Sequence, residues 1–111
     1  MSITVHDNPD QHRFEIEVDG ELAGIAEYHR SESHIVFPHT ETRTPFGGRG
    51  LGTVLVKAAL DAVREEGLGV QPQCWFVRDY IASHPDEYLA LVAPEDRAAF
   101  GLPSATPANR S

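Results

Sequence analysis

A cluster of four glycines within six residues constrains this chain most, because it stands where the hydrophobic pattern changes period. The cluster reads Gly47-Gly48-Arg49-Gly50-Leu51-Gly52. Glycine has no Cβ, so it adopts positive φ easily and lets the backbone come close to another group. A run this rich in glycine interrupts regular structure. The elements before and after it must therefore be separate.

Before the glycines, apolar and polar residues alternate, which is typical of strands with one buried face. Asp19-Gly20 is a strong signal for a type I′ hairpin turn, because both central residues of that turn need positive φ. Pro38 cannot donate a hydrogen bond to a neighbouring strand, so we expect a bulge, a splay or a sheet edge at that position. Strands that form an antiparallel meander are predicted over residues 3–6, 14–18, 22–29 and 35–42.

After the glycines, apolar residues recur at helical spacing and predict a helix from Leu51 to about Glu66, with Gly67 as its C-terminal stop. The residues that make this pattern are Leu51, Val54, Leu55, Ala58 and Ala62. A fifth strand is expected over residues 68–74, a second helix from residue 76 to about His84-Pro85, and a further helical turn over 88–92. The fold class is therefore α+β, with about five mainly antiparallel strands and two main helices in the order β-β-β-β-α-β-α.

Length and charge narrow the possible functions. A chain of 111 residues with 41% hydrophobic residues suits one globular domain. Seventeen acidic and nine basic residues give a net charge of −8, which disfavours nucleic acid and anionic membrane surfaces as partners and favours cationic ones. One cysteine excludes an internal disulfide. We find no membrane-spanning run and no signal segment, so a cytoplasmic location is expected.

The glycine cluster and the helix after it form a plausible phosphate cradle. The first N–H groups of a helix have no partners within the helix and lie at the positive end of its dipole, so they bind an anion even in an acidic chain. Thr53 stands where a P-loop requires lysine and where the dinucleotide-binding pattern requires a third glycine. On these residues alone, an ordinary glycine-rich loop before a helix remains an alternative.

This order of elements, with a Gly-x-Gly turn between strand and helix, resembles the acyl-CoA N-acyltransferase (GNAT) superfamily. Gly50-Leu51-Gly52 matches the second half of its Gln/Arg-x-x-Gly-x-Gly/Ala motif, whereas Gly47 stands where the family has Gln or Arg. Residues 14–24 and 39–41 and the pattern Cys74-x-Phe76-Val77-x-x-Tyr80-Ile81-x-x-His84-Pro85 resemble a miniature branch, the YjdJ-type proteins. That branch lacks the first helix pair and the terminal strands of larger acetyltransferases. The likeness covers roughly residues 3–93, which suggests an acyl-CoA-binding domain over residues 1–93 and a C-terminal extension over 94–111 that is flexible at its end.

The resemblance implies acetyl-CoA as co-substrate and assigns residues to it. The fourth strand would bind the pantetheine arm where it splays from the fifth. The residues expected beside the acyl group are His39, Thr40, Glu41 and Thr42. The residues expected around the pyrophosphate are Gly47, Gly48, Arg49, Gly50, Leu51, Gly52 and Thr53.

Transfer of an acyl group to an amine needs a base and stabilisation of the oxyanion. Glu41 is a candidate base if partial burial raises its pKa, and His39 is a second candidate because histidine titrates near neutral pH. Cys74 at a helix N-terminus would contact the acyl group or briefly accept it, and Tyr80 would protonate the leaving CoA thiolate. The structural alternatives are a hydrogen-bonded histidine, a solvated glutamate, a small buried cysteine and a core tyrosine.

Three functions remain open at this point. The first is an acetyl-CoA-dependent N-acetyltransferase that acts on a small or peptide amine, with a cationic acceptor favoured, by direct attack in a ternary complex. The second is a non-catalytic acyl-CoA-binding module, favoured by Gly47 and by the short acceptor region. The third is a thioester hydrolase that uses Cys74 with a histidine. No metal is expected, because His29, His34 and His39 cross a turn and alternate between strand faces.

Overall fold

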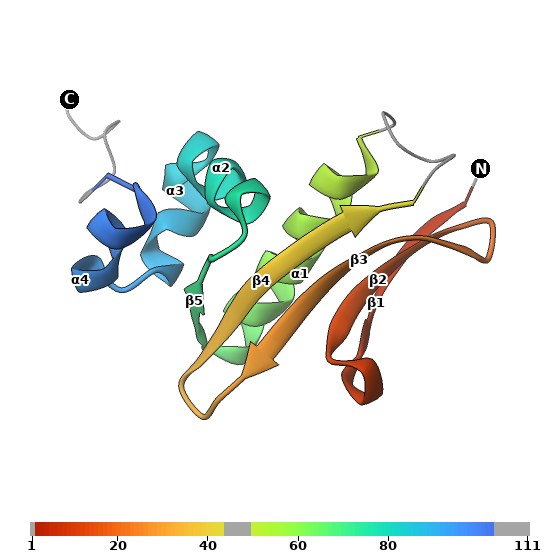
Figure 1. Cartoon of the computed structure of the whole chain (residues 1–111), viewed down its shortest axis with the longest axis horizontal. Helices are drawn as coiled ribbons and strands as arrows, with labels where there is room; N and C mark the ends of the chain where they lie inside the picture. The colour runs from red at the N-terminus through yellow and green to blue at the C-terminus, as the bar shows by residue number, and fades with distance from the viewer. Residues whose placement is uncertain (1, 44–49, 104–111) are drawn as a thin grey trace.

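One five-stranded sheet organises the molecule, in a computed structural model that describes residues 2–43 and 50–103. The strands lie side by side in chain order, and all neighbours are antiparallel except β4 and β5, which are parallel. Their bounds are β1 Ile3–Asn8, β2 Arg13–Val18, β3 Glu21–Arg30, β4 His34–Thr42 and β5 Gly69–Gln71. Helix α1 (Leu51–Glu66) connects β4 to β5 across one face of the sheet, and the other helices lie beyond β5 (Figure 1). The predicted α+β class and element order are confirmed.

The first turns form where local sequence signals place them. Asp19 and Gly20 have φ values of 52° and 85°, as a type I′ turn requires. Strand β1 runs to Asn8, beyond the predicted end at residue 6, and a short 3₁₀ turn covers Pro9–Gln11. The Asn8 side chain accepts a hydrogen bond from the Gln11 backbone N–H, so the polar cluster caps a turn rather than ending the strand early.

The core lies between the sheet and α1. Phe14, Tyr28 and Phe37 form its aromatic part, with ring centroids 5.4 to 6.5 Å apart. The buried face of α1 consists of Leu51, Gly52, Leu55, Val56, Ala59, Leu60 and Val63. The predicted stripe was wrong at Val54, which is 42% exposed, and Ala58 and Ala62 of that stripe are only half-buried. The buried residues of α1 are neighbouring pairs that recur once per helical turn, and Val54 lies outside the face that these pairs form.

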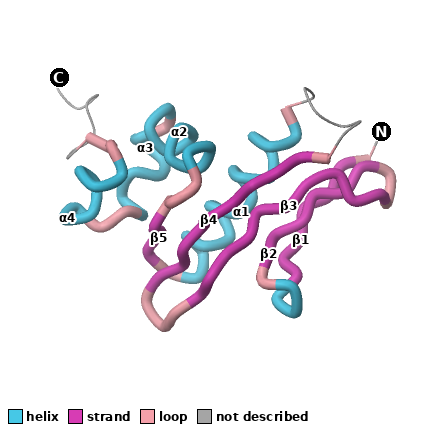
Figure 2. The backbone as a smooth tube through the Cα atoms, in the orientation of Figure 1, coloured by secondary structure: helices cyan, strands magenta, loops and turns pink. Residues whose placement is uncertain are grey.

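The chain after α1 is more helical than expected. β5 spans only three residues instead of the predicted 68–74, because Pro72 cannot donate to the ladder and Cys74 already caps α2 (Trp75–Ser83). The segment beyond α2 forms a series of short helical turns (Figure 2). These are α3 Pro85–Tyr88, a 3₁₀ turn Leu89–Leu91, α4 Pro94–Arg97 and a 3₁₀ turn Ala98–Phe100. The side chain of Leu102, just after them, packs into the core.

Strands β4 and β5 diverge near Pro38, as predicted. They pair only where His34–Val36 meets Gly69–Gln71. Beyond that point a single hydrogen bond, from the Cys74 N–H to the Phe37 carbonyl at 2.8 Å, connects the two segments. On the other side of β4, the register with β3 shifts between Glu27 and His29. None of the helices in residues 2–43 and 50–103 is long and apolar enough to cross a membrane.

Candidate functional site

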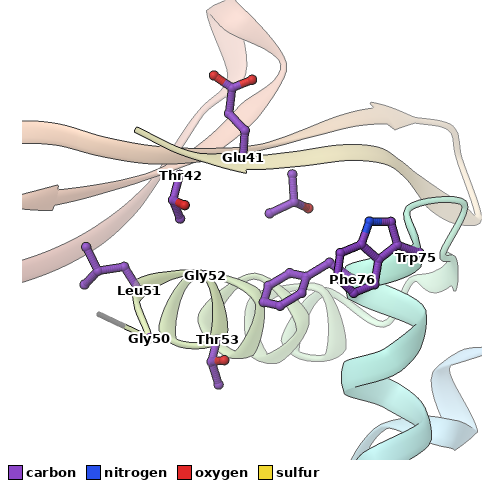
Figure 3. Close-up of a pocket in the computed structure, with 9 residues that line it drawn as sticks. Glu41, Thr42, Gly50, Leu51, Gly52, Thr53, Trp75 and Phe76 are labelled. Atoms are coloured by element: carbon purple, nitrogen blue, oxygen red, sulfur yellow. The ribbon is translucent and has the colours of Figure 1, made fainter. Parts of the chain in front are cut away.

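A cavity of about 350 Å³ opens between the end of β4, the start of α1 and the start of α2 (Figure 3). Three segments far apart in the sequence meet there. The chain passes from β4 through α1 to β5, and β5 leads into α2, whose start lies next to the end of β4 and the start of α1. The lining residues are Thr40, Glu41, Thr42, Gly50, Leu51, Gly52, Thr53, Trp75 and Phe76. The structure thus brings three of the four predicted residues of the fourth strand, all except His39, together with Gly50–Thr53 of the glycine turn.

The N-terminus of α1 supplies unpaired donors to this cavity. Gly50 caps the helix with φ of 72°, no side chain caps it, and no acidic residue stands in its first turn. The first intrahelical bond runs from the Val54 N–H to the Gly50 carbonyl, so the N–H groups of the three preceding residues lack helical partners. These donors and the dipole of a 16-residue helix favour an anion there. Gly47, Gly48 and Arg49 lie outside the described residues, so their role stays a prediction.

Two aromatic residues outside the predicted site, Trp75 and Phe76, form the opposite wall. A Cβ on Gly52 would lie 2.8 Å from Cε2 of Phe76, so the absent side chain makes room for this ring. Phe76 in turn meets Trp75 edge-on, with centroids 5.7 Å apart. The Trp75 side chain is 67% exposed. Their position directly after Cys74 was visible in the sequence, but helical spacing assigned Phe76 to a core face.

Alternation along β4 separates the candidate residues of this strand. Thr42 points toward α1, whereas the Glu41 side chain points to the opposite side of the strand (Figure 3). His39 and Glu41 share that far side, and His39 Nε2 lies 2.9 Å from Glu41 Oε1. The Oγ1 atom of Thr40 is buried and has no hydrogen-bond partner among the described residues.

The condition for Glu41 as a base is not met. Its side chain is 49% exposed, and the hydrogen bond with His39 lowers the pKa of Glu41 instead of raising it. His39 itself is not among the residues that line the cavity. The expected partial burial fails because this side of the sheet carries no helix at β4.

Cys74 and Tyr80 also lie outside the cavity lining. Cys74 is the N-cap of α2, as its place in the sequence suggested, but it is only 8% exposed and belongs to the core. Tyr80 stacks on His84 with centroids 4.3 Å apart and packs near Tyr88, which fits the alternative of a core tyrosine. The catalytic roles of both remain predictions.

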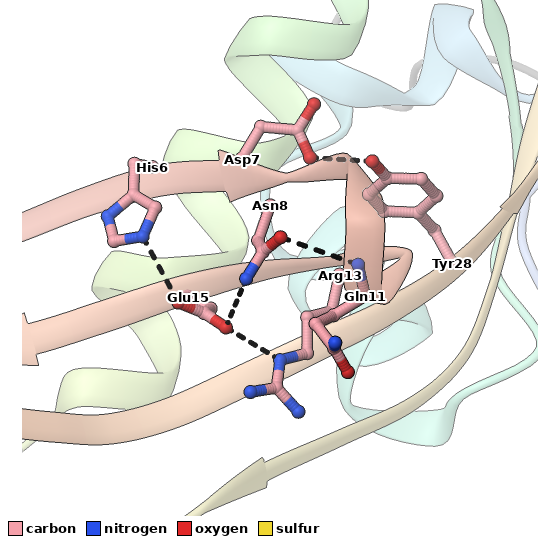
Figure 4. A network of polar contacts seen from close by, with 7 residues as sticks. All are labelled: His6, Asp7, Asn8, Gln11, Arg13, Glu15 and Tyr28. Atoms are coloured by element: carbon pink, nitrogen blue, oxygen red, sulfur yellow. Dashed lines mark hydrogen bonds and ion pairs between the residues drawn. The ribbon is translucent and has the colours of Figure 1, made fainter.

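A polar cluster on the helix-free face of the sheet has the composition of a metal site. Ligand atoms of His6, Glu15 and Glu17 lie within 4.8 Å of one another. The buried Glu15 carboxylate, however, already accepts hydrogen bonds from Arg13 Nε at 2.7 Å and Asn8 Nδ2 at 3.0 Å, and His6 Nε2 lies 3.1 Å away (Figure 4). Burial alone would raise the pKa of Glu15, but these contacts hold it below its usual value. The cluster is therefore explained as a network that joins β1 to β2.

Known proteins share both the sequence pattern and the fold. A family model described as GCN5-related N-acetyl-transferase matches residues 13–91. Protein NATD1 of Xenopus tropicalis is 30% identical over 96 residues, which cover 84% of this chain and 88% of that protein. Protein NATD1 of Homo sapiens is 40% identical over 57 residues, half of each chain. The solution structure of a GCN5-like protein from Staphylococcus aureus superposes with a TM-score of 0.58 at 22% identity, over 81% of this chain and 87% of that one. This chain belongs to the GCN5-related N-acetyltransferase family.

Proposed function

We propose that this protein transfers an acetyl group from acetyl-CoA to an amine, and that the cavity between β4, α1 and α2 binds the acetyl-CoA. One observation carries the proposal: the unpaired N–H groups at the start of α1 and the end of β4, where it diverges from β5, line the same cavity. The first turn of α1 offers backbone N–H groups to a pyrophosphate. The orphaned hydroxyl of Thr40 offers a hydrogen bond to a polar group of the bound molecule.

The cavity would serve chemistry chiefly by positioning. Acetyl-CoA supplies the thioester. The chain anchors its phosphate end at Gly50–Thr53 and leaves the region where β4 and β5 diverge free for the pantetheine arm. The backbone groups of Thr40–Thr42 that point away from β3 have no partner on β5, so they are available to that arm. Held in this way, the thioester meets a neutral amine directly, and positioning of the two reactants supplies much of the acceleration.

A second candidate is an acyl-CoA-binding module without turnover. It is favoured by a specific observation: among the described residues, the cavity holds no titratable side chain that points toward α1. Glu41 points away from α1 (Figure 3), while His39, Cys74 and Tyr80 lie outside the lining. A module of this kind would bind acyl-CoA as other members of the family do, but it would not catalyse acyl transfer.

Calorimetry with acetyl-CoA, CoA and ATP tests the shared part of both candidates. Both require binding of the two CoA species in preference to ATP, with a gain of about 2.7 kcal/mol in stability at a hundredfold excess of ligand over Kd. A folded sample that binds none of them refutes both. Thiol release across a panel of amines, with wild type and Cys74→Ala, then separates them. Turnover supports the enzyme, its absence supports the module, and equal turnover in Cys74→Ala removes that thiol from the mechanism.

A further inference from the structure

A second groove adjoins the cavity and shares one wall with it. It encloses about 300 Å³ between α2 and the turn that follows α4. Its α2 side is formed by Trp75, Arg78, Asp79 and Ala82, and its other side by residues 100–102. The four α2 positions follow the i, i+3, i+4, i+7 spacing of one helix face. Trp75 lines both spaces, so molecules bound in the two would touch the same indole.

Arg78 gives this groove a positive charge that no carboxylate of the described residues pairs with. Its Nε atom is buried and has no hydrogen-bond partner among the described residues. Within residues 2–43 and 50–103, no carboxylate forms an ion pair with its guanidinium. A buried donor left unpaired is costly, and a guanidinium matches a carboxylate with two parallel hydrogen bonds. A carboxylate bound in the groove would give this guanidinium a partner.

Apart from Asp79, the other side chains that line the groove are apolar. Trp75 is the most exposed large hydrophobic side chain among the described residues, at 67%. Phe100 and Leu102 face it from the other side of the groove and are partly or largely buried. Arg78 follows Trp75 by three positions along α2, a rise of about 4.5 Å. A molecule the size of an amino acid spans that distance.

We propose that this groove binds the acyl acceptor, and that the acceptor is an amine that also carries a carboxylate and an apolar group, as a free amino acid does. The inference rests on the proposed acetyl transfer and names its substrate class. The carboxylate pairs with Arg78, the apolar group covers Trp75, and the amine lies toward the cavity. The amine nitrogen attacks the thioester carbonyl, a C–N bond forms and the C–S bond breaks. The amine loses one proton, the CoA thiolate takes up one proton, and CoA leaves as the thiol.

Trp75 is the single tryptophan of the chain, so its fluorescence reports on this groove directly. Leucine and methionine are titrated into protein saturated with CoA, each beside its amide, which keeps the amine and the apolar group but lacks the carboxylate. Both amino acids should change the Trp75 emission saturably, and the amides should need at least about tenfold higher concentration, as expected for a lost charge-assisted hydrogen bond. Arg78→Gln should abolish this difference. Arg30→Gln is the matched control, because it removes an arginine at the end of β3, where the partners are Asp7 and Glu66.

The outcomes separate this inference from the proposed function. If calorimetry shows acetyl-CoA binding but amino acids and amides bind alike, or neither changes the Trp75 emission, the acceptor groove is refuted and the acetyl-CoA site stands. If acetyl-CoA does not bind, the proposed function fails first. If Arg78→Gln does not fold, the comparison of amino acid with amide on the wild type still decides. Thiol release with leucine but not with leucinamide would give independent support.

Discussion

Gly52→Ala tests whether the close approach between α1 and α2 shapes the cavity proposed to bind acetyl-CoA. The new Cβ would lie 2.8 Å from Phe76 Cε2, whereas ordinary contacts begin at 3.4 Å, so the ring must move by 3.4 − 2.8 = 0.6 Å. In a helix, alanine is favoured over glycine by about 1 kcal/mol. Moving the ring weakens its edge contact with Trp75, and such contacts contribute about 0.5–1.5 kcal/mol. The two effects nearly cancel, so we expect the free energy of unfolding to stay within about 1 kcal/mol of wild type.

Binding, in contrast, should suffer, because the displaced ring and the new methyl group both stand at the cavity wall. Urea unfolding gives the stability, and calorimetry with acetyl-CoA gives the affinity. In a Phe76→Ala background the obstacle is gone, so Gly52→Ala should then stabilise the helix by about 1 kcal/mol. Val54→Ala, at a 42% exposed position of the same helix turn, serves as the control for substitution near the N-terminus. If Gly52→Ala alone stabilises by the full amount and leaves the affinity unchanged, this account of Gly52 is wrong.

Two further predictions concern stability. The pKa of Glu15 is lower in the folded protein than in the unfolded chain. Its contribution to the free energy of unfolding is therefore present above pH ~4.5 and is lost as the pH falls through the folded pKa. Acid unfolding of Glu15→Gln should therefore depend less on pH than acid unfolding of wild type. Tyr88 is fully buried, donates to Asp61 Oδ1 at 2.7 Å and accepts from Lys57, and burial together with the Asp61 contact raises the pKa of Tyr88 to about 12. Tyr88→Phe should cost about 1 kcal/mol in urea unfolding, and a change below a few tenths would show that this bond between α3 and α1 contributes nothing.

Local signals predicted most of the fold. The alternation of Phe14, Ile16 and Val18 and the turn at Asp19-Gly20 depend only on neighbouring residues. The structure agrees with both, except that Glu15 on the other face of the strand is buried. The end of β5 and the turns after α2 depend on what those segments pack against. The spacing of apolar residues alone could not show that Leu102 returns to the core.

The same distinction applies to the site. Gly50–Thr53 and Thr40–Thr42 were predicted because the glycine turn and the family pattern are readable in short stretches of sequence. The wall of Trp75 and Phe76 reaches the cavity only after the chain has passed through α1 and β5. Gly52 was expected to admit a ligand, and the structure shows that it makes room for the Phe76 ring. Only a contact between distant segments could show this.

The two-residue period of β4 has a consequence for mechanism. Thr40 and Thr42 alternate with His39 and Glu41, so the residues proposed to bind acetyl-CoA and the residues able to take a proton lie on opposite sides of the strand. Thr40→Val should therefore weaken acetyl-CoA binding by about 0.5–1.5 kcal/mol, the contribution of one hydrogen bond, and by more than Glu41→Gln does in the same calorimetric titration. The reverse order would mean that the bound molecule lies against the Glu41 side.

With the acceptor beside Trp75, a base at Glu41 is on the wrong side of the sheet, so the amine must lose its proton elsewhere. The rate of thiol release should then rise with pH toward the pKa of the acceptor amine rather than level off near that of a carboxylate.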